Sequence, residues 1–137
     1  MKTRAIVLFL LALIVTACGG ANAAHTPDDV ISAFRAAGLE AENAQPLTRD
    51  DYGAAPYVGQ GVRFLIPSLC ADCGGRVFAL DNQKDLESVK TYYDALGESN
   101  ALFFSWTFAK DNILVQINGD LDETTARQYE TALNGLD

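Results

Sequence analysis

The stretch that decides the fold is ALFFSWTFAKDNILVQING, residues 101–119. Every second residue from Leu102 to Phe108 is large and apolar, which is the two-residue period of a β-strand. A polar turn, Lys110-Asp111-Asn112, separates this segment from a second apolar one, and such a pair forms an antiparallel hairpin. We therefore predict strands over residues 101–109 and 113–117. The aromatic row of the first strand is expected to face the core and consists of Phe104, Trp106 and Phe108.

A second hairpin is predicted upstream of the first. Val62, Phe64 and Ile66 share one face of a strand over residues 61–66, which Pro67 ends. Its partner strand covers residues 76–80, and residues 68–75 form the connection. A weaker strand over residues 40–46 and a long surface loop over residues 48–60 precede this hairpin.

Capping residues predict three helices. Thr26 and Pro27 are favoured at a helix start, and two aspartates follow them in the first turn. Asp120 is expected to cap the last helix, with Glu123 in a capping box. Gly38 and Gly97 are the expected stops of the first two helices. The predicted helices run from Thr26 to Gly38, from Asp81 or Asn82 to Gly97, and from Asp120 to about Leu133.

The element order αβ-ββα-ββα predicts an α+β domain. Hairpin-linked strands are antiparallel, so we expect an antiparallel sheet of about five strands with helices packed mainly on one face. The two hairpin–helix units also show a faint repeat with an offset of 37 residues, for example Tyr92 with Tyr129 and Leu96 with Leu133. This repeat indicates either a duplication or the pattern that any two such units share.

The N-terminus has the pattern of a signal peptide. Lys2 and Arg4 precede an apolar run over residues 5–15, and small residues follow it. The run is shorter than the roughly 20 apolar residues that a transmembrane helix needs. We therefore predict that residues 1–17 are removed.

The expected cleavage region, Val15-Thr16-Ala17-Cys18, resembles the lipobox of bacterial lipoproteins. The resemblance implies a diacylglyceryl group on the Cys18 sulfur, cleavage before Cys18 and acylation of the new amine. Residues 18–25 would then be a flexible tether, and residues 26–137 a single domain at the membrane surface, outside the cytoplasm. An ordinary secretory signal, cut near Ala17 or Ala24, is the alternative.

The charge balance excludes some partners. Without residues 1–17 the chain keeps 8 basic and 18 acidic residues, a net charge of −10. Such a surface argues against nucleic acid and against direct docking on anionic lipid. We expect the membrane, through the lipid, and an envelope protein or a small ligand as partners.

Cys70-Ala71-Asp72-Cys73 is the one motif with reactive potential. In an oxidising compartment the pair forms a disulfide, either a clasp on the hairpin turn or a redox centre. A turn lacks the helix N-terminus that lowers thiol pKa values, which favours the clasp. Zinc would need further ligands, and the single histidine, His25, is expected to be a solvated linker residue. We predict neither a metal site nor a cofactor.

The remaining candidates define a possible binding surface. Acidic and aromatic residues on a loop can form a binding patch. The candidates are Asp50, Asp51, Tyr52 and Tyr57 in the long loop, and Trp106 on the strongest strand. No arrangement typical of a catalytic site accompanies them.

The domain also resembles small bacterial lipoproteins that have no established activity. The stretches that resemble them are residues 64–68, 74–78, 101–106 and 114–121. We predict a non-catalytic module that binds a protein or a ligand. The alternatives are a thiol–disulfide protein that uses Cys70 and Cys73, and a structural or stress-related envelope protein.

Overall fold

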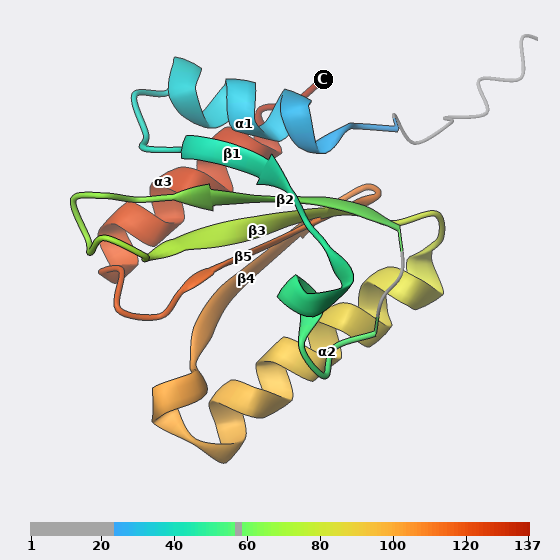
Figure 1. Cartoon of the computed structure of the whole chain (residues 1–137). Coiled ribbons are helices and arrows are strands. Elements are labelled where there is room, and N and C mark those ends of the chain that lie inside the picture. Colours follow the sequence, from blue (N-terminus) through green and yellow to red (C-terminus); the bar gives the residue numbers. More distant parts are fainter. Residues whose placement is uncertain (1–23, 57–58) are drawn as a thin grey trace, which may run out of the picture.

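The structure, a computed structural model, describes residues 24–56 and 59–137. The predicted signal peptide, the predicted lipidation site at Cys18, most of the predicted tether and Tyr57 lie outside the described residues. Within the described ranges, no helix has both the length and the apolar character that crossing a bilayer requires. The elements are α1 (Pro27–Ala36), β1 (Glu42–Pro46), η1 (Arg49–Tyr52), β2 (Gln60–Leu65), β3 (Gly74–Ala79), α2 (Gln83–Ser99), η2 (Ala101–Phe103), β4 (Ser105–Lys110), β5 (Ile113–Asn118) and α3 (Glu123–Asn134) (Figure 1).

The five strands form one antiparallel sheet in the order β1-β2-β3-β5-β4. This confirms the predicted α+β fold and both hairpins. The two hairpins meet at β3 and β5, where Val77 lies opposite Val115 and both side chains are fully buried. Central strands buried on both faces are rich in branched apolar residues, as β5 is.

Helices cover both faces of the sheet (Figure 1). α1 and α3 share one face, where Phe34 and Tyr129 pack against Phe64 of β2. α2 and η1 cover part of the other face, over Phe78 and Leu114. Two of the three helices therefore lie on the predicted common face. The rest of the second face stays open beside α2.

The arrangement of the two hairpin–helix units argues against the duplication. If the two units were duplicates, a rotation would superpose β2-β3 on β4-β5. That rotation must reverse both the order and the direction of the strands, so its axis is perpendicular to the sheet. Such a two-fold rotation would leave both helices on one face, but α2 and α3 lie on opposite faces. The two units therefore have opposite handedness, and the 37-residue repeat reflects a shared pattern rather than a repeated structure.

Several predicted boundaries were wrong. The strands predicted from residues 40 and 76 begin at Glu42 and Gly74, and three other differences are larger or affect the caps. The strand predicted from residue 101 begins at Ser105, because Ser105 pairs with Asn118, the last residue of β5. Helix α2 continues through Gly97 to Ser99. The N-cap of α3 is Asp122 rather than Asp120, and its side chain accepts a hydrogen bond from the Thr125 amide.

Tyr129 provides a test of the core between α1, α3 and the sheet. Its hydroxyl donates a 2.6 Å hydrogen bond to the Glu40 carbonyl, and burial raises its pKa from 10 to about 12. Because the pKa of the Tyr129 hydroxyl is higher in the folded state than in the unfolded state, its contribution to stability is fully present below pH 10. This contribution is lost as the pH rises through 12. We expect Tyr129→Phe to cost about 1 kcal/mol at pH 8 and to remove part of the alkaline loss of stability. Urea unfolding at pH 8, 10 and 12 measures both, and parallel pH profiles for the two proteins would contradict the prediction.

Candidate functional site

The most unusual surface feature is a run of exposed apolar residues between α2 and β4, here called the apolar turn: Leu102, Phe103 and Phe104. These residues are 87%, 59% and 42% exposed, respectively. Among the described residues, they are the large apolar residues that are exposed to solvent. Isolated exposed apolar residues are ordinary, whereas adjacent ones indicate an interaction site. The predicted core position of Phe104 was therefore wrong.

The apolar turn has a defined structure. The Asn100 side-chain oxygen accepts a hydrogen bond from the Leu102 amide, and the Asn100 carbonyl accepts one from the Phe103 amide. Phe104 lies between two glycines, since a Cβ on Gly97 would be 3.2 Å from the Phe104 Cα and one on Gly119 would be 2.3 Å from its carbonyl oxygen. Gly97 thus permits a close contact instead of ending the helix. Phe104 fixes the base of the turn, while Leu102 and Phe103 project.

Two adjacent hollows lie beside the apolar turn, on the open part of the α2 face. The first, of about 320 Å³, runs beneath the turn and includes Ser105, whose buried Oγ has no hydrogen-bond partner among the described residues. The second, of about 230 Å³, is here called the arginine groove. It is lined chiefly by Asp51, Arg63, Asp72, Arg76, Gln116 and Asn118. Gln116 and Asn118 line both hollows, so the two are adjacent.

The arginine groove has a polar floor set by strand register. Arg63 of β2 lies opposite Arg76 of β3, and Arg76 lies opposite Gln116 of β5. The Arg76 guanidinium donates a 2.9 Å hydrogen bond to the Gln116 side-chain oxygen, and Arg63 donates one of 3.1 Å to Gln45. Both arginines therefore bind neutral amides.

Two aspartates stand at the rim of the groove. The Asp51 carboxylate accepts hydrogen bonds from the Thr48 amide and hydroxyl, each 2.7 Å long. These bonds lower the pKa of Asp51, and the positive charges of Arg63 and Arg76 lower it further. Asp72 belongs to the turn between β2 and β3. The groove thus combines two positive and two negative side chains.

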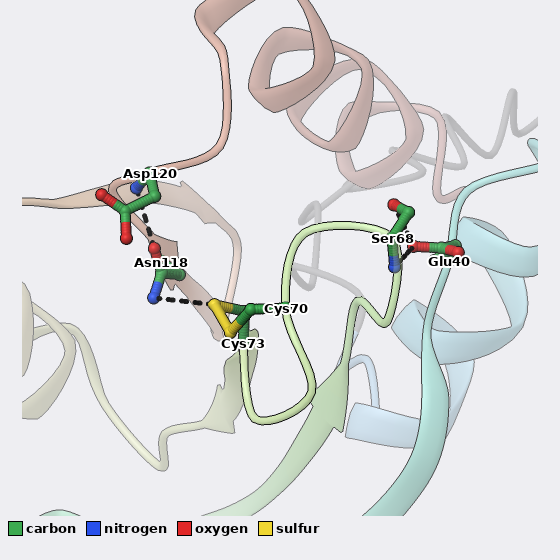
Figure 2. The surroundings of a disulfide bond; sticks show 6 residues. All are labelled: Glu40, Ser68, Cys70, Cys73, Asn118 and Asp120. Atoms are coloured by element: carbon green, nitrogen blue, oxygen red, sulfur yellow. Dashed lines mark hydrogen bonds between the residues drawn. A yellow bond between two sulfur atoms is a disulfide. The ribbon is translucent and has the colours of Figure 1, made fainter.

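The Cys70–Cys73 pair forms a disulfide in the turn between β2 and β3 (Figure 2). The turn is held on both sides, because Ser68 donates two hydrogen bonds to the Glu40 carboxylate and Asn118 donates one to the Cys73 sulfur. Cys70 is exposed and Cys73 is buried. The pair is thus in the predicted hairpin connection and not at a helix N-terminus.

The clasp hypothesis predicts a modest effect of removing the disulfide. We expect Cys70→Ser with Cys73→Ser to lower the free energy of unfolding by about 2 kcal/mol, because the loop that the bond closes is short. Thiol labelling across a glutathione series should give a reduction potential below about −300 mV. A value near −200 mV, with the fold intact in both redox states, would support the thiol–disulfide alternative instead.

His25 is not the solvated linker residue predicted from the sequence. It is 8% exposed, and its backbone amide and carbonyl make 2.9 Å hydrogen bonds with the Asn112 side chain. Its Nε2 lies 3.5 Å from an oxygen of Asp111. The domain therefore begins one residue before the predicted boundary, fastened to the turn between β4 and β5.

The residues proposed as a binding surface do not come together. Asp51 lines the arginine groove, and Asp50 is exposed beside it in η1. Tyr52 is 3% exposed and packs on Phe78, so it belongs to the core. Trp106 faces α3 on the side of the sheet opposite the arginine groove, where its indole N–H donates to the Leu121 carbonyl and Arg127 lies 5.7 Å from its ring centroid. Its ring also contacts the ring of Phe104, at the base of the apolar turn, with 5.0 Å between the centroids.

The sequence contains some information on two features that the prediction missed, the Arg63–Arg76 pair and the apolar turn. The predicted hairpin carries an arginine on each arm, but its bounds, 61–66 and 76–80, place Arg63 well inside its strand and Arg76 at the start of its own. The observed strands, Gln60–Leu65 and Gly74–Ala79, bring the two opposite each other. Asn100 before four consecutive apolar residues is typical of a turn rather than an alternating strand. Among the described residues, no group of three or more His, Cys, Asp or Glu side chains is placed to hold a metal ion.

Comparison with protein families, curated proteins and solved structures gives no match to this chain.

Proposed function

We propose that this protein is a non-catalytic binding module, held on a membrane outside the cytoplasm by a lipid on Cys18, and that the apolar turn docks a partner protein. The observation that supports the docking is the exposure of Leu102 and Phe103 on a turn that hydrogen bonds and two glycine contacts hold in place. A rigid apolar projection loses little conformational entropy on binding. Such side chains commonly contribute most of the affinity of an interface.

The position of the apolar turn favours a protein over a lipid surface. The turn precedes β4, whereas His25, from which the chain continues toward Cys18, is fastened to the turn that follows β4. The six residues of β4 separate the two points by roughly 20 Å. A domain anchored through Cys18 can thus present the apolar turn away from its own membrane.

The charged residues near the apolar turn indicate which kind of partner surface it would bind. Asp120 lines the same hollow as Leu102, and Glu98 lines a neighbouring hollow with Phe104. Both carboxylates are exposed, so they would repel anionic lipid and favour basic groups. The expected partner surface is an apolar recess with lysine or arginine at its edge.

Site-specific cross-linking in growing cells tests the docking. We expect a photoreactive phenylalanine analogue at position 103 to give a discrete protein adduct that the same analogue at Ala37, exposed after α1, does not give. After identification of the adduct, Leu102→Ser with Phe103→Ser should weaken binding of that purified protein at least tenfold. Exposed substitutions typically change stability by less than about 0.5 kcal/mol, so the fold should persist.

Three outcomes of the cross-linking would contradict the docking. Adducts with lipid only would assign the apolar turn to a membrane. Adducts with a second copy of the chain would assign it to self-association. Equal, diffuse adducts at both positions would support the structural envelope role without a dedicated partner.

A further inference from the structure

The pairing of Arg63 with Arg76 is unusual for this chain. The two residues are direct register partners on neighbouring antiparallel strands, so their Cβ atoms are separated by roughly 5 Å on the same face. Like charges in this relation destabilise a sheet. They occur in a protein whose net charge is −8, in which acidic partners are abundant.

Neither arginine uses a carboxylate as its partner. The four ion pairs among the described residues involve His25, Lys90 and Arg127, and none includes Arg63 or Arg76. Instead, Gln116, which is 8% exposed, accepts the hydrogen bond from Arg76, and Gln45 accepts the one from Arg63. These two bonds leave most of the guanidinium N–H donors for another group, since each guanidinium has five.

We propose that Arg63 and Arg76 form a carboxylate-binding site in the arginine groove. Arginine presents planar pairs of N–H donors that match the two oxygens of a carboxylate. The Gln116 and Gln45 contacts orient the guanidiniums without neutralising them. This site does not depend on docking at the apolar turn, although the two hollows are adjacent.

The rim of the groove removes the electrostatic advantage that a doubly charged oxyanion would have in a cationic site. Asp51 and Asp72 balance the two arginines, so the lining has no net positive charge. The second charge of a phosphate dianion would face equal numbers of positive and negative side chains, so it would bring no net attraction in the groove. The expected ligand is therefore a carboxylate, supplied by a small organic acid or by a peptide.

The test uses the mature chain in detergent micelles, with arginine side-chain Nε–Hε groups observed by NMR. Acetate and a short acetylated peptide with a free C-terminal carboxylate are the two carboxylate probes, and inorganic phosphate is the comparison. Ionic strength is held constant with sodium chloride. We expect saturable shifts at Arg63 and Arg76 and none at Arg127, which lies on the opposite face with Trp106. The probe with the higher affinity indicates whether an organic acid or a peptide is the source of the carboxylate.

Substitutions with opposite expected effects on carboxylate binding make the test more specific. Arg63→Gln should weaken carboxylate binding at least fivefold, and Arg76→Lys, which keeps the charge but loses the planar donors, should weaken it severalfold. Asp72→Asn removes a rim charge and should tighten binding two- to threefold. Arg127→Gln is the control for a lost positive charge and should leave affinity unchanged.

Two results would overturn the proposal. One is equal, non-saturating shifts at all arginines, which would mean general ion screening. The other is saturation by phosphate but not by carboxylates. Neither result bears on the apolar turn, because the cross-linking at position 103 reports on a different surface.

Discussion

Replacing Phe34 by alanine is expected to lower the free energy of unfolding by about 3–5 kcal/mol. Phe34 is fully buried on α1, and its ring meets Tyr129 of α3 edge to face at 4.9 Å and Phe64 of β2 at 5.7 Å. Its removal would leave a cavity where three elements meet. Since domains of this size are stable by only about 5–15 kcal/mol, the loss would approach global unfolding.

Urea denaturation measures this effect through the fluorescence of Trp106, the single tryptophan of the chain. Ser32→Ala is the matched control, because Ser32 is on the same helix and its side chain is exposed. The control should change the free energy of unfolding by less than about 0.5 kcal/mol. A Phe34→Ala effect below 1 kcal/mol would mean that α1 does not dock on the sheet as described.

Replacing Cys18 by alanine is expected to abolish lipid attachment. The lipobox resemblance at residues 15–18 assigns the acyl chains to this sulfur and to the new N-terminal amine. Each buried acyl methylene contributes about 0.8 kcal/mol to membrane binding, so two or more chains give a stable anchor. The acidic domain offers no electrostatic substitute for that anchor on an anionic membrane.

Metabolic labelling with an alkyne fatty acid and intact-mass measurement test this directly. The native chain should carry label and have the mass of residues 18–137 plus lipid, and Cys18→Ala should carry no label. Membrane sedimentation alone is insufficient, because an uncleaved signal peptide would also retain the variant. Cys70→Ala with Cys73→Ala is the control and should keep the label. A native chain that carries no label, with an N-terminus near residue 18 or residue 25, would support an ordinary secretory signal. Label on the Cys18→Ala protein would place the lipid on another residue.

Only part of the candidate site was predicted from the sequence. Asp51 belonged to the predicted binding surface and does line the arginine groove. Tyr52 and Trp106 were proposed with it, but whether an aromatic residue contacts solvent or core depends on which element covers it. Here η1 carries Tyr52 onto Phe78, and α3 covers Trp106.

Local patterns determined the elements of this protein. The two-residue period of Ile113, Val115 and Ile117, the Thr26 cap and the hairpin turns depend on neighbours in sequence, so the sequence predicted the strands, the helices and the α+β class. Strand pairing across distant segments required the tertiary structure. α2 and α3 pack on opposite faces of the sheet, and the end of β5 at Asn118 leaves residues 101–104 without a partner strand. The apolar turn and the Arg63–Arg76 groove therefore depend on packing and register, which non-local contacts decide.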